Sequence, residues 1–234
     1  MAISLALLAY KEADNLRVLL PELKKVMDYL PEEYEIFVVD TQKALDDTEE
    51  VCKENGVAYY NQRKPYFGGA FRDAVAIAKY DKFLILDSDG SIDPHSIPKL
   101  YKKYVTGKYD VVIGSRYIKG GKTDSGKLAI FMSWGVNTVF RIIIGTSAKD
   151  ISINYRIYDT KQLKATKTTC DHYDIQEEVL LRMKKNNKKM RIGEVPIQFK
   201  ERLHGESKRR MLLFAINYFK SIFKFIGIKF NIIK

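Results

Sequence analysis

Short apolar segments alternate with amphipathic segments along the first half of the chain. The apolar segments are rich in Val, Ile and Leu, as buried strands are, and the amphipathic ones repeat apolar residues at helical spacing. This pattern predicts strands over 3–8, 34–40, 57–61, 82–87 and 109–116, and helices over 14–30, 46–56, 68–80 and 95–107. Strands that alternate with helices indicate an α/β fold with a mostly parallel sheet and helices on both faces. Asp14 is expected to cap the first helix.

The second half of the chain is less regular. Residues 128–145 are apolar on most sides and predict a helix, and residues 174–189 predict a clearly amphipathic one. Residues 190–202 predict a strand, and the proline within it indicates an edge strand. On the second of these helices, Glu178 is expected either to face a site or to pair with Arg182 four residues later.

Residues 209–234 are basic and rich in aromatic side chains. At helical spacing, Lys220, Lys224, Asn217 and Ser221 form a narrow polar stripe beside a broad apolar arc. This pattern favours an amphipathic helix in the membrane interface. The alternatives are a terminal helix packed on the core and the start of spanning segments that the sequence does not include. We therefore expect a domain over 1–210 and a membrane-interface helix over 211–234.

Charge narrows the class of partner. The chain has 40 Lys and Arg against 29 Asp and Glu, and the excess lies toward the C-terminal end. A net charge of +11 favours an anionic partner, which can be acidic lipid, a phosphorylated substrate or nucleic acid. Nucleic acid is not expected, because no segment interleaves basic and aromatic residues as recognition motifs do.

The cysteines and the N-terminus indicate the cellular compartment. Cys52 and Cys170 are far apart and predict neither a disulfide framework nor a zinc site, which favours a reducing compartment. The first residues lack the basic region of a signal peptide and are expected to form a strand. No stretch reaches about 18 uninterrupted apolar residues, so no conventional spanning helix is evident.

Polar residues follow four of the predicted strands. Tyr10–Glu12, Asp40, Asp87–Asp89 and Gly114–Arg116 all lie where a strand ends. Because ligands of parallel sheets bind at the carboxyl ends of the strands, we expect these residues to face one crevice.

Asp87 and Asp89 stand two positions apart at the end of the fourth strand. Side chains at that spacing point to the same side, and two close carboxylates repel unless a cation or a proton lies between them. Mg²⁺ and Mn²⁺ suit such a pair, because they accept one or two carboxylates together with substrate phosphates. A simple turn is the alternative, since Asp, Ser and Gly are common in turns. The position of the pair and its basic surroundings favour a metal site.

Several segments carry a family resemblance. "FLILDSDGSIDPHSIPKL" followed by "DVVIGSRYIKGG" resembles the family-2 glycosyltransferases with a GT-A fold, in the branch of dolichol-phosphate mannose synthases and polyprenyl-phosphate glycosyltransferases. The segments "AYKEADNL", "GGAFRDAVAIA", "DISINYRIYD" and "EVPIQFKERLHGESK" agree with that family in the same order. The resemblance covers residues 3 to about 210, which is nearly the whole chain.

The resemblance implies an enzyme, its substrates and its location. It implies inverting transfer of a sugar from a nucleotide-diphosphate sugar to a polyprenyl phosphate, by a protein bound to the cytoplasmic face of a membrane. It implies Mg²⁺ or Mn²⁺ on Asp87 and Asp89. It leaves a membrane partner protein and the oligomeric state open. The implied donor-binding residues are Tyr10, Glu12, Asp40, Gly68, Asp87 and Ser88, the acceptor-phosphate residues are Arg116, Arg202, Ser207 and Lys208, and the catalytic residues are Asp89, Arg116, Arg202 and Lys208.

The chain departs from the family pattern in three places. After Asp40 the chain reads "TQK" where the family usually has Asp-Gly-Ser, so the nucleobase stays open. Lys11 stands where Asn is usual, and Asn154 stands where Gly is usual. Asn tolerates the left-handed backbone conformation better than most residues, so a turn at Asn154 is compatible with the substitution. Gly68 has an alternative of its own, since a glycine at a helix start can serve close packing as well as phosphate binding.

The acceptor decides which chemistry the site needs. A phosphate monoester has a second pKa of about 6, so it arrives ionised and needs cations to position it rather than a base. A hydroxyl acceptor would need a carboxylate base near the reacting carbon. A transferase that acts on a sugar or protein hydroxyl, and a non-catalytic membrane-binding member of the family, stay open as alternatives.

Overall fold

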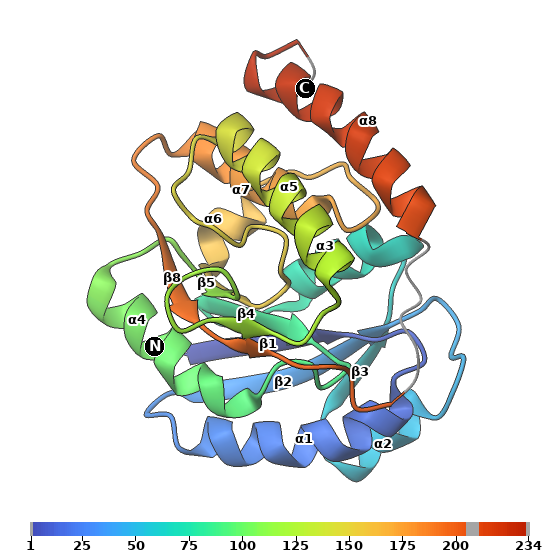
Figure 1. Ribbon diagram of the computed structural model, residues 1–234. Coiled ribbons are helices and arrows are strands. Elements are labelled where there is room, and N and C mark those ends of the chain that lie inside the picture. Colours follow the sequence, from blue (N-terminus) through green and yellow to red (C-terminus); the bar gives the residue numbers. More distant parts are fainter. Residues whose placement is uncertain (1, 205–210, 233–234) are drawn as a thin grey trace.

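The computed structural model describes residues 2–204 and 211–232, and its main sheet has the order β3-β2-β1-β4-β7-β5-β8 (Figure 1). Its strands pair in parallel except for β7, which runs antiparallel between β4 and β5. The strands are β1 (Ala2–Leu8), β2 (Glu33–Asp40), β3 (Ala58–Asn61), β4 (Lys82–Asp87), β5 (Val111–Ser115), β7 (Arg156–Asp159) and β8 (Ile192–Pro196). Two short strands, β6 (Lys122–Thr123) and β9 (Gln198–Phe199), pair separately. The predicted α/β fold with a mostly parallel sheet is confirmed.

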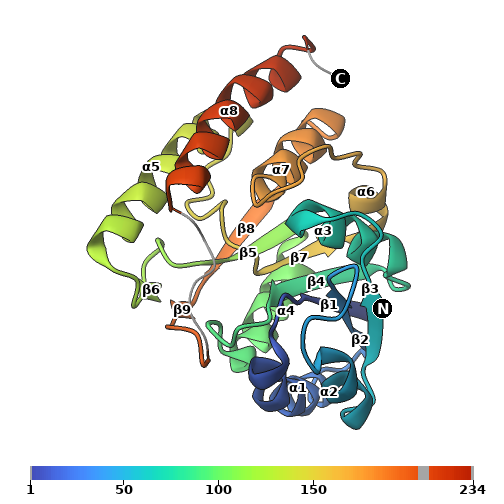
Figure 2. The same cartoon turned by 90° about the vertical axis from the view of Figure 1, so that its right-hand side faces the viewer.

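Helices cover both faces of the sheet. One face carries α1 (Ala13–Asp28), α2 (Thr48–Glu54) and α4 (Ile97–Gly107), which follows the short helix η1 (Pro94–Ser96). The other face carries α3 (Tyr66–Ile77), α6 (Thr160–Lys164) and α7 (Ile175–Asn186). Beyond α7, α5 (Lys127–Ile144) and α8 (Met211–Lys229) pack on α7 and on each other, and they form the outer layer of this side (Figure 2).

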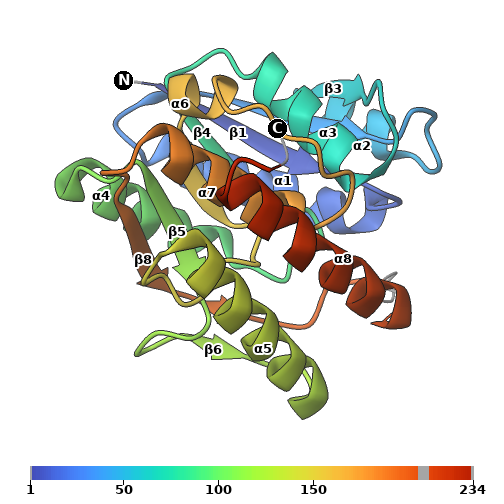
Figure 3. The same ribbon diagram turned by 90° about the horizontal axis from the view of Figure 1, so that it is seen from above.

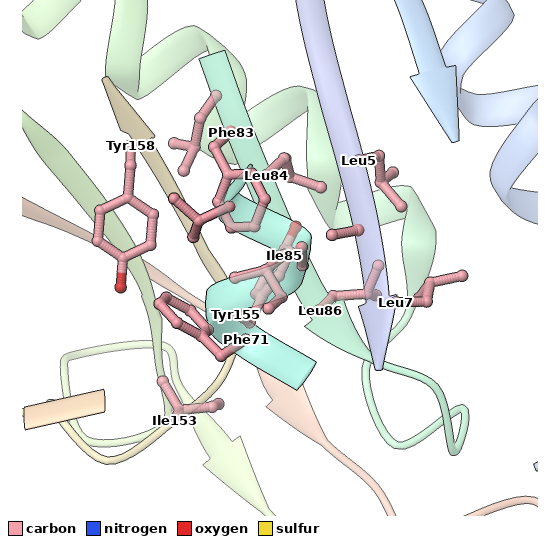
Figure 4. Close-up of a cluster of buried hydrophobic side chains, with 14 of the residues drawn as sticks. Leu5, Leu7, Phe71, Phe83, Leu84, Ile85, Leu86, Ile153, Tyr155 and Tyr158 are labelled. Atoms are coloured by element: carbon pink, nitrogen blue, oxygen red, sulfur yellow. The ribbon is translucent and has the colours of Figure 1, made fainter. Parts of the chain in front are cut away.

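The central strands hold the core. Leu84 and its neighbours in β4 are fully buried, because the strand has a partner on each side and helices over both faces. Phe83 meets Phe71 of α3 edge to face, with 6.2 Å between ring centroids, and Tyr158 of β7 lies beside it (Figure 4). This packing explains why the segment before Asp87 is continuously apolar.

Strand β7 was not predicted, because it contains an arginine that is completely buried. The Arg156 guanidinium donates to the backbone oxygens of Ile151 and Ile153, at 2.5 and 2.8 Å. It also donates to the Gln176 backbone oxygen at 2.7 Å and to the Tyr158 hydroxyl at 3.0 Å. A buried charge is tolerated only when its hydrogen-bonding groups find partners, and these four bonds supply them.

Two further predictions differ from the structure by more than small shifts of element ends. The predicted strand over 190–202 is divided into β8, which is an edge strand as expected, and β9. The expectation for Asp14 is wrong: α1 begins at Ala13 with Glu12 in the N-cap position. The Ala13 amide donates instead to Asp46 at 2.9 Å, so a carboxylate from the loop before α2 caps the helix.

Helix α8 packs on the protein by one face and exposes aromatic residues on another. Ser221 donates to Asp174 at 2.6 Å, so part of the predicted polar stripe faces α7 and not solvent. Phe219 and Phe223 are mostly exposed. The helix lies beside α5 (Figure 3) and combines core packing, which was the alternative, with exposed aromatic side chains.

The same interface buries a carboxyl group. Glu177 is completely buried, and its Oε1 accepts a hydrogen bond from the Tyr218 hydroxyl at 3.1 Å. Among the described residues, its Oε2 has no hydrogen-bond partner. Burial raises the pKa of Glu177 to about 8. Between about pH 4.5 and pH 8 the carboxyl group is therefore protonated in the folded protein and ionised in the unfolded chain.

Folding stability should therefore decrease as the pH rises from about 4.5 to about 8. Each unit of pKa difference corresponds to about 1.4 kcal/mol. Glu177→Gln keeps the acceptor for Tyr218 and removes the ionisation. We expect the variant to have the higher Tm at pH 8, and the difference to vanish below about pH 4.5. Thermal unfolding followed by circular dichroism across this range measures it.

Glu50→Gln, an exposed change on α2, is the control and should not reproduce the higher Tm at pH 8. A Glu177→Gln advantage that is the same at both ends of the range would contradict the assignment.

Candidate active site

The carboxyl ends of the parallel strands meet along one edge of the sheet, as predicted. Leu8 at the end of β1 is in register with Asp87 on one side and with Val39 on the other. Asp40 therefore lies one strand beyond β1, and the predicted donor and metal residues share this edge.

The turn after β4 is built around a left-handed glycine. Gly90 has φ +72°, and a Cβ there would lie 2.5 Å from a side-chain carbon of Leu203. The Ser91 amide donates to Asp89 Oδ1 at 3.0 Å, as in the turn that was the alternative reading. The Ser91 hydroxyl is buried and has no hydrogen-bond partner within the described part of the chain. The turn thus exists, and it contains a buried hydroxyl that has no partner among the described residues.

Arg202 brings three of the predicted residues together. Its guanidinium lies 2.9 Å from Asp89 Oδ2 and 3.7 Å from Glu12 Oε1. Glu12 also accepts a hydrogen bond from Asn15 of α1 at 2.5 Å. The segment that carries Arg202 is held in place, because the Leu203 amide donates to the Asp89 backbone oxygen at 3.0 Å.

Arg116 forms a second, more deeply buried pair. Its Nε and Nη2 lie 2.7 Å from the two carboxylate oxygens of Asp150, which is completely buried. The guanidinium also lies over the rings of Tyr117 and Phe199, 5.0 and 5.3 Å from their centroids. Burial alone would lower the pKa of Arg116, but the hydrogen bonds and charge of Asp150 outweigh it and raise the pKa. Arg116 is thus a fixed cation with one edge committed to Asp150.

A buried amide contacts the other member of the acidic pair. Asn154 Nδ2 donates to Asp87 Oδ1 at 3.1 Å. Asn154 does not have a positive φ, so its presence in place of glycine does not reflect a left-handed turn.

Asp40 is held by the strand next to it. Its Oδ2 accepts from the Tyr59 hydroxyl at 3.0 Å and its Oδ1 from the Thr41 amide at 2.7 Å. Burial raises the pKa of Asp40, and these hydrogen bonds act in the opposite direction. A hydrogen bond also holds the altered loop after Asp40 in place, since the Gln42 side chain donates to the Arg63 backbone oxygen at 3.1 Å.

The remaining predicted residues lie in different surroundings. The Gly68 amide donates to the Asp171 backbone oxygen at 2.8 Å, and a Cβ there would lie 2.2 Å from the Cys170 backbone oxygen. Packing thus accounts for this glycine, and we leave it out of the proposed donor site. Ser88 donates to the Leu8 backbone oxygen at 2.7 Å, and Tyr10 is half exposed. Ser207 and Lys208 lie outside the described residues.

Glu178 takes the alternative role. It pairs with Arg182 at 2.8 Å and accepts hydrogen bonds from the Thr169 and Cys170 amides at 2.8 and 2.7 Å. It therefore fixes the loop before α7 and does not face the acidic pair.

Sequence reasoning missed the partners that hold the site. Asp150 belongs to a segment that resembles the family, but no role followed from the residues because its partner is 34 positions away. Asn137 of α5 was missed as well. Its Oδ1 accepts from the Ile151 and Ser152 amides at 2.7 and 3.2 Å, so α5 fixes the loop that carries Asp150. The only sequence feature that could have indicated the role of Asn137 is its polar side chain within an otherwise apolar helix.

The buried pair predicts a large loss of stability when it is broken. Asp150→Ala leaves the Arg116 guanidinium buried without its counter-ion, which typically costs about 3–5 kcal/mol. Urea unfolding measures the change. Asp171→Ala is the matched control, because it breaks an equally short Arg–Asp pair (2.6 Å to Arg72) that is half exposed. That change should cost less than about 1 kcal/mol. Equal losses in the two variants would contradict the importance given to Arg116–Asp150.

The chain is similar in sequence to known transferases. Over 133 residues the chain is 37% identical to an undecaprenyl-phosphate mannosyltransferase of Micrococcus luteus, which covers 55% of this chain and 53% of that protein. Over 215 residues it is 27% identical to a dolichol-phosphate mannosyltransferase of Pyrococcus furiosus, which covers 89% of this chain and 59% of that protein. The chain thus spans little more than half the length of these relatives.

Solved structures share the fold. Glucosyl-3-phosphoglycerate synthase from Mycobacterium tuberculosis, in complex with Mn²⁺ and UDP-glucose, superposes with a TM-score of 0.73 at 17% identity over 97% of this chain and 78% of that chain. The model of the family "Glycosyl transferase family 2" matches residues 4–170, which is most of the chain. The protein therefore belongs to glycosyl transferase family 2, as its motifs predict.

Proposed function

We propose that the protein transfers a sugar from a nucleotide-diphosphate sugar to a polyprenyl phosphate, with inversion at the anomeric carbon and with Mg²⁺ or Mn²⁺. The observation that carries the proposal is the cluster of Asp89, Glu12 and Arg202 beside Asp87 at the end of β4. Three separate segments supply these side chains, which is more than a turn requires. The relatives named above act on undecaprenyl and dolichol phosphate with mannose, so mannose is the first sugar to test.

The residues present fit a divalent cation. Asp87 and Asp89 offer carboxylate oxygens, and Ser91 offers a buried hydroxyl without a partner among the described residues. Within residues 2–204 and 211–232, no group of three or more His, Cys, Asp or Glu side chains could hold a metal. Two carboxylates with substrate oxygens are typical of Mg²⁺ and Mn²⁺, not of zinc. When bound, the cation neutralises the charge that develops on the leaving diphosphate.

The arginines fit an acceptor that is already an anion. A phosphate monoester needs no base near neutral pH, and guanidinium groups bind its oxygens in pairs. Arg116 is pre-oriented by Asp150, and Arg202 is held between Glu12 and Asp89. We assign the acceptor phosphate to these two residues, with Ser207 and Lys208 as predicted further contacts. Direct attack by the phosphate oxygen on the anomeric carbon inverts its configuration.

The donor is assigned to residues at the ends of β1, β2 and β4. Asp40, Glu12, Tyr10 and Ser88 are the proposed residues for the nucleoside and diphosphate. Because Asp40 already accepts from Tyr59 and Thr41, a nucleobase or ribose would join an existing hydrogen-bond network.

An assay for a lipid-linked product tests the proposal. Protein, Mn²⁺, a polyprenyl phosphate and radiolabelled GDP-mannose or UDP-glucose should give counts that extract into organic solvent. Asp87→Ala and Asp89→Ala should each reduce the rate at least about 100-fold, since removal of a group that stabilises transition-state charge costs that much. Glu50→Gln should leave the rate unchanged.

The outcomes separate the alternatives. Transfer to a sugar or peptide hydroxyl, without need for the lipid phosphate, would favour the hydroxyl-transferase alternative. Absence of any product together with absence of nucleotide binding in the presence of Mn²⁺ would favour a non-catalytic member.

We further propose that α5 and α8 dock on the cytoplasmic face of an anionic membrane. Phe131 and Trp134 of α5, and Phe219 and Phe223 of α8, are each more than half exposed, and the two helices lie side by side (Figure 3). Lys220 is exposed near these aromatic residues in the chain. Apolar side chains beside lysine are typical of interfacial helices. Within the described residues, α5 is also the helix long and apolar enough to cross a membrane, by length and composition only.

Vesicle binding tests the docking face. The double variant Trp134→Ala/Phe223→Ala should bind phosphatidylglycerol vesicles at least about 10-fold more weakly in co-sedimentation, because each aromatic side chain contributes roughly 1.5–3 kcal/mol when buried. Tyr29→Ala is the matched control: Tyr29 is 87% exposed at the end of α1, on the other side of the sheet. Equal loss in the control and the double variant would contradict the assignment.

A further inference from the structure

We propose that Asn154 and Gln176 are positioning residues for the carboxylate of Asp87, joined to it in a buried relay of side-chain amides. The inference rests on the proposed function, in which Asp87 is a ligand of Mg²⁺ or Mn²⁺. It assigns a purpose to an asparagine that stands where the family usually has glycine.

The geometry of the relay is continuous from α7 to the end of β4. Gln176 Nε2 donates to Asn154 Oδ1 at 2.7 Å, and Asn154 Nδ2 donates to Asp87 Oδ1 at 3.1 Å. Gln176 is 1% exposed and Asn154 is 6% exposed, so water does not compete freely with either bond. Both amides are therefore part of the folded interior, and only Asp87 at the end of the relay is half-buried.

The first bond fixes the direction of the second. An amide side chain can rotate by half a turn and present either its oxygen or its NH₂ group to a neighbour. Because the oxygen of Asn154 accepts from Gln176, its NH₂ group must point toward Asp87. The backbone of Gln176 is fixed, since its oxygen accepts from the buried Arg156 at 2.7 Å. Among the described residues the side-chain Oε1 of Gln176 has no hydrogen-bond partner, so the bond to Asn154 is the one that orients this amide.

The relay orients Asp87 without neutralising it. A lysine or arginine at position 154 would also donate a hydrogen bond, but its charge would cancel the carboxylate charge that attracts a cation. A glycine would supply no donor at all. The neutral amide fixes one carboxylate oxygen and leaves the negative charge available. Loss of such an orienting partner typically weakens metal binding about 10- to 100-fold.

Mn²⁺ titration followed by electron paramagnetic resonance tests the inference. The samples are the full chain with excess GDP or UDP, and the readout is the dissociation constant of Mn²⁺. Asn154→Ala should weaken Mn²⁺ binding about 10-fold or more. Asn154→Gly, which restores the usual family residue, serves as a second variant with low risk of misfolding and should have the same effect.

A double-variant cycle tests whether Gln176 acts through Asn154. Gln176→Ala should weaken Mn²⁺ binding by a smaller factor than Asn154→Ala. The double variant should bind no more weakly than Asn154→Ala alone, because the relay is already broken. Independent, multiplicative effects would overturn the relay.

Gln162→Ala is the matched control. Like Asn154→Ala, it removes a hydrogen bond from a side-chain amide to an aspartate. Gln162 Nε2 donates to Asp110 Oδ1 at 2.8 Å, and Gln162 lies on α6 outside the site. Mn²⁺ affinity should stay within about twofold. Thermal unfolding of all variants separates a loss of stability from a loss of metal affinity.

The failures can be told apart. If wild type binds Mn²⁺, Asp87→Ala does not, and both Asn154 variants bind as wild type, the inference is overturned and the proposed function stands. If wild type binds no Mn²⁺ with either nucleotide, the proposed metal site and the inference both fail.

Discussion

The buried Arg156 guanidinium is the interaction on which the arrangement of the site depends. It sits in the single antiparallel strand of the main sheet and joins that strand to the loop before it and to α7 through backbone oxygens of Ile151, Ile153 and Gln176. A guanidinium without these partners could not stay buried. The loop is therefore fixed in one path, and its two ends carry Asp150 to Arg116 and Asn154 to Asp87.

The fixed loop also explains how the site holds so many charges. Asp89 and Glu12 share Arg202, and Asp150 holds Arg116, so both arginines assigned to the acceptor phosphate already face a carboxylate. When an anionic ligand binds, such an arginine exchanges its carboxylate partner for the ligand. It is therefore paired with an anion both before and after binding. Arg116 and Arg202 differ in this respect. Asp150 is completely buried and bound through both oxygens, whereas Arg202 makes one short and one long contact and can release them more easily.

The sequence predicted the features that follow from local pattern. Apolar runs that end in Asp40 or Asp87 predicted strands whose ends meet, because a parallel sheet places all such ends on one edge. It did not predict β7, since a strand with a central arginine does not look buried until its distant carbonyl partners are known. Asp150 was missed for the same reason, and for Gly68 phosphate binding and close packing both stayed open, because its packing partner, Asp171, is far away in the chain. What the sequence lacked was long-range pairing of polar groups.

Helix α5 links the proposed membrane face to the proposed acceptor site. On its inner side Asn137 binds the loop that carries Asp150, and the Ser133 hydroxyl lies 3.4 Å from Arg116 Nη2. On its outer side the adjacent Trp134 is exposed. A polyprenyl phosphate must keep its hydrocarbon in the membrane while its phosphate reaches a cation. In α5, Ser133 contacts the arginine on the inner side and Trp134 is exposed on the outer side. The helix meets both demands, because one rigid element then sets the distance between the lipid and the phosphate site.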